Sequence, residues 1–223
     1  MRGTEHLARA LEALPHVGSV RDFAVEGGML RHGIVETRSA GVLTAKQLEA
    51  ADAPGLYDFY FAGLSEPSRR NFVPYPLFHT PPVSPGALAE RIAEWRREDD
   101  WSAILLAKVG QVVGFGLLKR IRSEHVTSGL AIRDDCAGKG LGHLVQILLN
   151  GQARMLNVKR FHVKIVSDNL ASIRLHEKCG FRRNGVVPWD GYEELRDYLA
   201  RNDPEGVAVD RHMIRWVIEL NDE

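Results

Sequence analysis

Cysteine is scarce in this sequence, and neither sign of charge is in excess. Two cysteines in 223 residues cannot build the disulfide framework of a small secreted domain, so they indicate a reducing compartment and a cytoplasmic protein. The 29 Lys and Arg residues balance the 29 Asp and Glu residues. This neutral total argues against a protein that coats nucleic acid and against a polybasic membrane anchor.

Long apolar runs and metal-ligand spacings are missing as well. No apolar segment approaches the roughly 18 residues that a membrane-spanning helix needs. Residues 1–13 contain two acids and no apolar stretch, which is unlike a secretory signal. The nine histidines show neither His-x-x-x-His nor paired Cys/His spacing, so we predict no bound metal. We expect no membrane partner and no nucleic-acid partner.

The composition, 44% apolar and 26% charged, is typical of a globular protein, and the length suits one domain with an added extension. We place the extension at residues 1–38 and the main domain at residues 39–223. Within the extension, three leucines at helical spacing predict a short amphipathic helix, and residues 21–26 and 30–38 flank a Gly-Gly pair that predicts a hairpin. Its role is open between an added sheet edge, a contact in a homodimer and a lid. The leucines are Leu7, Leu11 and Leu14, and the glycines are Gly27 and Gly28.

In the main domain, antiparallel strands come first and a β-α-β-α alternation follows, which predicts a mixed sheet with helices on both faces. Asp52 is the expected N-cap of the first helix, and Gly110-Gln111 the expected type II′ turn of a hairpin. Residues 66–86 contain six prolines and predict an irregular loop. The expected helices cover residues 52–63, 86–98, 141–156, 169–179 and 192–199, and the expected strands cover residues 103–109, 112–118, 124–133, 161–166, 185–189 and 207–220.

A glycine cluster lies where the strand at 124–133 gives way to a helix. Gly138, Gly140 and Gly142 alternate there, and an apolar helical stripe starts within the cluster at Leu141. Glycine lets backbone N–H groups line a concave site, and the helix N-terminus adds about half a positive charge. These features favour an anion site, most naturally for phosphates. The alternative is a glycine-rich connector that binds nothing.

The spacing of the cluster excludes two common phosphate motifs. G-x-G-x-G followed by His143 lacks the third glycine of the dinucleotide fingerprint, and the sequence contains no G-x-x-x-x-G-K-[ST] P-loop. A second segment follows about 30 residues later, at residues 169–181. There Asp168 or Asn169 is the expected helix cap and Gly180 the expected left-handed C′ residue, with a buried stripe formed by Ala171, Leu175 and Cys179.

Together the two segments resemble the Gcn5-related N-acetyltransferase (GNAT) superfamily. The first is similar to the acetyl-CoA signature, a strand ending in V-x-P followed by [RQ]-x-x-G-x-[GA], and the second to N-x-x-[AS]-x-x-L-Y-x-x-x-G-F. Ile132, Gly140 and Gly142 match the first pattern, whereas Asp134 replaces its proline and Ala137 its Arg or Gln. The resemblance implies an α/β (α+β) fold, the acyl-CoA N-acyltransferase fold, with a mostly antiparallel central sheet of six to seven strands.

The resemblance also implies which residues bind acetyl-CoA as co-substrate. The glycine loop would bind the pyrophosphate through its amides, the preceding strand would contact the pantetheine, and the second helix would add side-chain contacts. The implied residues are Leu130, Ala131, Ile132, Ala137, Gly138, Lys139, Gly140, Leu141, Gly142, His143, Asn169 and Ser172.

Catalytic roles are expected for His176 and Glu124. The family's tyrosine, the proton donor to the departing CoA sulfur in many members, corresponds to His176, whose unperturbed pKa of about 6.5 suits proton transfer. A helix residue that only contacts CoA or water is the alternative. Glu124 or His125, early in the expected strand, is the candidate base for the amine, although a surface strand end explains both equally. Cys136, beside the glycine loop, could in principle form a covalent acyl-enzyme. The resemblance disfavours this, because the family transfers the acetyl group directly.

The acceptor is expected to be a small amine. The variable parts of the family that build the acceptor pocket correspond to residues 66–86, with Tyr75, Phe78 and His79, and to residues 189–205, with Trp189 and Tyr192. A pocket lined by these aromatic residues and by acids would suit a cationic or amino-sugar acceptor. The alternative is that the aromatic residues only anchor the loops. The resemblance thus implies a small-molecule N-acetyltransferase. The alternatives are a protein N-terminal or lysine acetyltransferase and a non-catalytic acyl-CoA-binding module.

Overall fold

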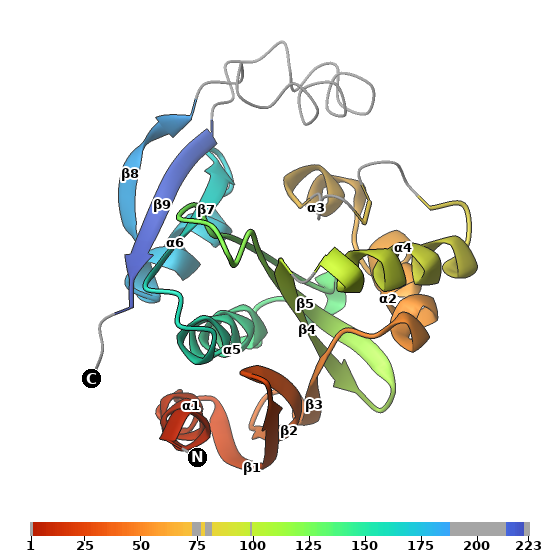
Figure 1. Cartoon of the computed structure of the whole chain (residues 1–223), viewed down its shortest axis with the longest axis horizontal. Helices are drawn as coiled ribbons and strands as arrows, with labels where there is room; N and C mark the ends of the chain where they lie inside the picture. Colours follow the sequence, from red (N-terminus) through yellow and green to blue (C-terminus); the bar gives the residue numbers. More distant parts are fainter. Residues whose placement is uncertain (1, 73–76, 79–81, 99, 188–212, 221–223) are drawn as a thin grey trace.

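The computed structural model describes residues 2–72, 77–78, 82–98, 100–187 and 213–220. Among these residues, nine strands form one sheet in the order β1-β2-β3-β4-β5-β6-β7-β9-β8 (Figure 1). The strands are β1 Val17–Glu26, β2 Met29–Thr37, β3 Gly41–Gln47, β4 Trp101–Lys108, β5 Gln111–Lys119, β6 Thr127–Ile132, β7 Arg160–Val166, β8 Arg182–Val187 and β9 Met213–Glu219. The helices are α1 Arg2–Glu12, α2 Ala53–Phe61, α3 Glu66–Asn71, α4 Pro85–Glu98, α5 Leu141–Met155 and α6 Leu170–Lys178, with short 3-10 turns at Ala50–Asp52 and Asp134–Cys136.

The predicted mixed, mostly antiparallel sheet is confirmed, because β6 and β7 are the only parallel neighbours among the described strands. The predicted count of six to seven strands is wrong. The hairpin of the extension joins the sheet as β1 and β2, and β3, which the sequence patterns did not reveal, connects that hairpin to β4. Both residues of the predicted Gly27-Gly28 turn have positive φ, 58° and 77°.

Helices cover both faces of the sheet, as predicted. On one face α1 and α5 pack against a core that contains Leu11, Leu106 and Leu148. On the other face α2 and α4 pack against a core that contains Phe59 and Leu105 (Figure 1). Neighbouring residues of β4 point to opposite cores, as the alternation of a strand buried on both faces requires. Since leucines of α1 belong to the first core, the extension is built into the domain rather than appended to it.

Three local predictions need correction. The β4–β5 turn is Val109-Gly110 with φ of 47° and 81°, a type I′ pattern one residue earlier than expected. The proline-rich segment is not wholly irregular, because it begins with α3, which Ser65 caps by accepting a hydrogen bond from the Ser68 amide. Asp52 is the N-cap residue of α2, but its side chain makes no capping hydrogen bond; its carboxylate instead accepts from the Glu49 amide at 3.0 Å. The helix expected at residues 192–199 lies outside the described residues.

Candidate active-site cleft

The sheet splits between β6 and β7. The two strands pair only at Thr127 and Ser128, opposite His162 and Val163 on β7. Beyond Ser128, β6 continues beside β5 alone, in antiparallel register as far as Ile132 opposite Gly114. A wedge-shaped opening in the sheet therefore begins after Ser128 and widens toward the glycine loop.

The edge of β6 that faces this opening carries polar backbone groups that have no partner among the described strands. Val126 accepts from the His162 amide of β7, whereas the Arg133 amide donates to Val113 of β5. Backbone direction alternates along a strand, so Leu130 and Ile132 point their N–H and C=O toward β7, where pairing has ended. Such groups need partners from water or from a ligand. The β6 edge is thus prepared to bind an extended molecule by backbone hydrogen bonds.

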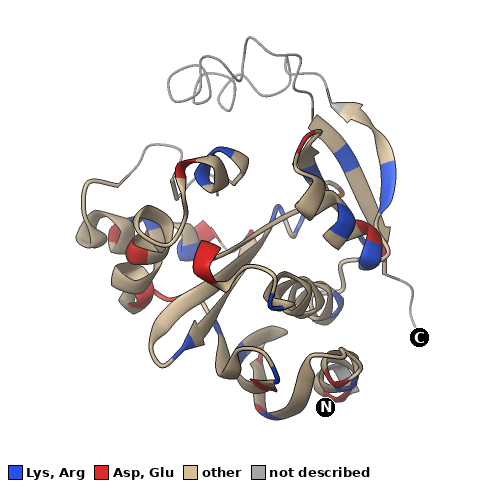
Figure 2. Ribbon diagram, turned by 180° about the vertical axis from the view of Figure 1, so that it is seen from behind, with Lys and Arg blue, Asp and Glu red and all other residues tan. Residues whose placement is uncertain are grey.

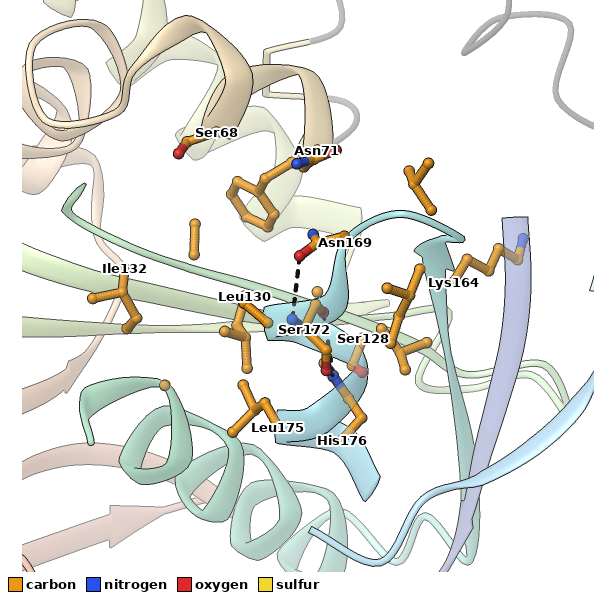
Figure 3. Close-up of a pocket in the computed structure, with 18 of the residues that line it drawn as sticks. Ser68, Asn71, Ser128, Leu130, Ile132, Lys164, Asn169, Ser172, Leu175 and His176 are labelled. Carbon is orange, nitrogen blue, oxygen red and sulfur yellow. Dashed lines mark hydrogen bonds between the residues drawn. The ribbon is translucent and has the colours of Figure 1, made fainter. Parts of the chain in front are cut away.

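A cavity of about 410 Å³ occupies the opening, a size within the range of small-molecule sites. Its walls are β6, β7, α3 and α6, and Figure 3 shows side chains from all four converging on it. Seven of the residues predicted to bind cofactor or act in catalysis line it: Leu130, Ala131, Ile132, Gly142, Asn169, Ser172 and His176.

The glycine loop lies at the end of the opening. Gly138 and Gly140 have φ of 76° and 81°, so both occupy the left-handed region that favours glycine. Gly140 is the N-cap of α5, and the first intrahelical hydrogen bond runs from the Leu144 amide to its carbonyl. The amides of Leu141, Gly142 and His143 precede that bond and are the donors that a helix start leaves for an anion. Ala137, Gly138 and Lys139 are exposed beside them.

Helix α6 forms the opposite wall, and its caps are as predicted. The Asn169 side chain accepts from the Ser172 amide at 3.2 Å, which selects Asn169 over Asp168 as the N-cap. Gly180 has φ of 86°, and the amides of Gly180 and Phe181 donate to Glu177 and His176 in a Schellman arrangement.

The predicted buried stripe of α6 is wrong. Ala171 is exposed and Leu175 and Cys179 are half-buried, whereas His176 is 2% exposed. Its ring lies edge-on to Phe181 at 4.9 Å, so the C-terminal turn packs on the histidine rather than on the leucine. Leu175 instead faces the start of α5, where a Cβ added to Gly142 would lie 3.2 Å from its Cδ2 atom. Gly142 therefore permits the close approach of the two helices.

His176 is held in one tautomer. Its Nδ1 atom lies 2.7 Å from the carbonyl oxygen of Ser172, a contact that requires the ring proton on Nδ1. The Nε2 atom is buried and has no hydrogen-bond partner among the described residues. Burial lowers the pKa of His176 to about 4, although the contact with Ser172 opposes this shift. A neutral ring with its proton directed into the helix argues against the predicted role as proton donor to sulfur.

Glu124, the other predicted catalytic residue, lies outside the cleft. The strand expected from residue 124 begins at Thr127, and both Glu124 and His125 are exposed in the preceding turn. Ser123 and Arg120 fold this turn back on itself through the Ser123 hydroxyl, so Glu124 is not part of the strand that lines the cleft. Cys136 lies in the 3-10 turn before the glycine loop, where burial and Asp135 raise the pKa of its thiol. An unactivated thiol does not support an acyl-enzyme.

Helix α3 is a wall that the sequence did not reveal. Ser68, Asn71 and Phe72 line the cavity from this side. Asp134, at the position of the family's proline, ties α3 to the glycine loop: its carboxylate accepts from the Ser65 amide at 2.7 Å and the Ser68 hydroxyl at 2.8 Å. Desolvation opposes these bonds, but together they lower the pKa of Asp134. The substitution of proline therefore has a structural explanation.

The described lining of the cleft is basic. It includes Arg70, Lys119 and Lys164 and no carboxylate among the described residues. Burial, followed by neighbouring positive charge, lowers the pKa of Lys119 and of Lys164 to about 8. Figure 2 shows further Lys and Arg on α6, β8 and β9. The residues expected to form the acceptor pocket lie mostly outside this described lining.

Most residues of that expected acceptor pocket cannot be placed. Tyr75, His79 and residues 189–205 lie outside the described residues. Phe78 is fully buried and stacks on Tyr60 at 3.9 Å, so it anchors the core rather than the cleft. No group of three or more potential metal ligands occurs among the described residues, and none of the described helices is long and apolar enough to cross a membrane.

The comparisons agree with this geometry. A protein-family model described as an acetyltransferase (GNAT) domain matches residues 43–182. The chain belongs to the GNAT acetyltransferase family. The match runs from β3 to the start of β8, so it contains the split strands, the glycine loop and α6, and leaves the N-terminal extension outside. A search of curated protein sequences found no match.

Solved GNAT structures share the fold at low sequence identity. A putative acetyltransferase from Salmonella typhimurium, solved with its cofactor acetyl-CoA, is 20% identical with a TM-score of 0.55, over 81% of this chain and 95% of that one. Ribosomal-protein-S5-alanine acetyltransferase from Vibrio fischeri is 13% identical with a TM-score of 0.64, over 85% and 97%. The spermidine/spermine N-acetyltransferase from Vibrio cholerae, in mutant forms, is 16% identical with a TM-score of 0.57, over 80% and 95%.

Proposed function

We propose that this GNAT enzyme transfers an acetyl group from acetyl-CoA directly to a primary amine of a small molecule. The observation that supports the proposal best is the split between β6 and β7, whose open backbone edge leads to the N-terminus of α5. The pyrophosphate binds the amides of Leu141, Gly142 and His143. The pantetheine lies along Leu130 and Ile132, opposite Asn169 and Ser172.

The reaction needs an oriented thioester and a neutral amine. The Leu130 N–H donates to the thioester carbonyl and stabilises negative charge on its oxygen as the amine nitrogen attacks the carbon. The new C–N bond forms, the C–S bond breaks, and CoA leaves as a thiolate. The Nδ1–H group of His176 donates to the Ser172 carbonyl and is not directed at the sulfur. The thiolate therefore takes its proton from solvent. Positioning therefore supplies most of the catalysis.

A proton acceptor for the amine comes from the basic lining rather than from Glu124. Lys164, on the β7 wall of the cleft, has a pKa of about 8, so an appreciable fraction is neutral at slightly alkaline pH. A neutral lysine accepts the proton that the attacking amine releases. The same positive lining disfavours polycationic acceptors and favours a monoamine, or one that carries an anionic group.

The decisive test is an acetyl-transfer assay that measures free CoA thiol. The full chain is incubated with acetyl-CoA and a panel of monoamines, amino acids, polyamines and short peptides. We expect turnover with small monoamines. Turnover only with peptides would select a protein acetyltransferase, an activity that the Vibrio fischeri relative represents. Tight acetyl-CoA binding without turnover on any amine would select a non-catalytic acyl-CoA-binding module.

A further inference from the structure

The N-terminal extension reaches the glycine loop at His16. This residue lies between α1 and β1, and its carbonyl accepts a hydrogen bond from the Arg38 amide at 2.8 Å, which fixes it to the end of β2. Its ring covers the α-carbon of Gly140, so closely that an added Cβ would lie 2.8 Å from three ring atoms.

A second contact joins the same two segments one residue along the loop. The hydroxyl of Ser39, just after β2, donates to the carbonyl of Lys139 at 2.8 Å. Lys139 and Gly140 are the residues immediately before α5, so both contacts act on the backbone that orients the first amides of the helix. The family match starts at residue 43, and both contacting side chains therefore lie outside it.

The contact also gathers titratable groups. The rings of His16 and His143 lie 6.1 Å apart between centroids. Burial first, and the charge of Lys178 on α6 second, lower the pKa of both histidines. One nitrogen of each ring, Nε2 of His16 and Nδ1 of His143, is buried without a hydrogen-bond partner in the structure. The contact therefore brings together two imidazole rings whose neutral forms are favoured by burial.

We propose that the N-terminal extension is part of the CoA site: His16 positions the glycine loop, and the His16–His143 pair takes up a proton when the CoA pyrophosphate binds beside Lys178. The proposal rests on the function proposed above. It gives the extension a role in cofactor binding in addition to its place at the edge of the sheet. Lys178 is the other charged group whose electrostatic effect reaches both rings, and the backbone of Gly140 lies against the His16 ring.

The direction of the pH effect follows from the charges. Both histidines are neutral in the free protein at pH 7, and a nearby phosphate favours the imidazolium form. Binding is then linked to proton uptake, so CoA affinity decreases as the pH rises through the pKa that these histidines have in the complex. Loss of the His16 ring removes both the loop contact and part of the uptake.

Isothermal titration of CoA into the full chain at pH 6.5, in buffers of different ionisation enthalpy, measures affinity and proton uptake together. We expect wild type to take up protons, and His16→Gln to weaken CoA binding about tenfold and to reduce the uptake by about half. The matched control is His32→Gln, a histidine of the same extension whose ring contacts Asp22 rather than the loop. It should bind CoA as wild type does.

Two further arms keep the result interpretable. Lys178→Met, on the surface of α6, tests the charge cluster without disturbing the extension, and should weaken CoA binding. Dephospho-CoA, which lacks the 3′-phosphate, should show the same loss with His16→Gln as CoA does, and a loss confined to CoA would overturn the pyrophosphate assignment. Equal affinity and equal uptake in wild type and His16→Gln would overturn the inference alone. Absence of CoA binding by wild type would instead refute the proposed function.

Discussion

Replacement of His176 by phenylalanine tests whether this buried ring is neutral in the folded protein. Phenylalanine is planar, of similar size, and can keep the edge-on contact with Phe181. It removes a buried nitrogen that has no partner in the structure, along with the hydrogen bond to the Ser172 carbonyl. An unpartnered buried polar atom costs about 1–3 kcal/mol and a hydrogen bond contributes about 1 kcal/mol. We therefore expect His176→Phe to be at least as stable as wild type at pH 7.5.

The two proteins should differ in acid. The folded protein holds His176 neutral with a pKa of about 4, whereas the unfolded chain protonates it below about 6.5, so the unfolded state binds more protons between these values. Wild-type stability is lost as the pH falls through this window. Linkage gives a loss of about 2 kcal/mol from His176 between pH 7.5 and pH 5. The phenylalanine variant lacks this contribution.

Urea unfolding at pH 7.5 and pH 5, followed by far-UV circular dichroism, measures the difference. The drop in unfolding free energy should be about 2 kcal/mol smaller in His176→Phe than in wild type. Other histidines titrate equally in both proteins and cancel. His125→Gln, in the exposed turn before β6, is the control and should follow wild type. A pH dependence that is the same in His176→Phe and wild type would refute the assignment of a buried, neutral His176.

Substitutions at four other positions, two of them with a matched variant, test the site. Gly140→Ala should weaken acetyl-CoA binding at least about tenfold, whereas Gly110→Ala, with the same φ of 81° but no neighbour within 4 Å, should change only stability; equal affinities would contradict the loop assignment. Asn169→Ala should destabilise the protein by about 1 kcal/mol through loss of the α6 cap and raise the KM for acetyl-CoA, and Asn169→Asp should restore the cap. Lys164→Met should lower kcat/KM about tenfold at pH 8, and an unchanged pH–rate profile would exclude it as proton acceptor. Cys136→Ala should retain full activity, and loss of turnover with normal acetyl-CoA binding would revive an acyl-enzyme.

The parts of the fold that were predictable are those with local causes. Gly140 begins α5 and Gly180 ends α6, because both have the positive φ that favours glycine. Leu7 and Leu11 lie four residues apart, the spacing of a helix that is buried on one side. Strand β3 could not be predicted from the sequence. It is short, and its exposed Val42 weakens the alternation of apolar and polar residues that marks a strand. Pro67 made an irregular loop the natural expectation for α3, although Ser65 before a proline in the first turn is itself a helix-start signal.

The predictions for the site divide along the same line. The backbone-based sites Leu130 and Gly142 were implied by the resemblance to the GNAT signature, and the structure places both at the cavity. Side-chain roles depend on tertiary surroundings that no local pattern encodes. His176 is buried because Phe181 folds back over it, and Lys164 reaches the cleft because β6 and β7 separate. Neither burial nor separation can be read from periodicity alone.

Titration of isotopically labelled protein with acetyl-CoA, observed through backbone amide chemical shifts, tests the central claim most directly. Acetyl-CoA is proposed to lie along β6 between the glycine loop and α6. Saturable shifts should therefore concentrate at Leu130, Ile132, Gly142 and Ser172, with little change at the β4–β5 turn. No saturable shift at these amides with millimolar acetyl-CoA, or shifts centred elsewhere on the protein, would contradict the account.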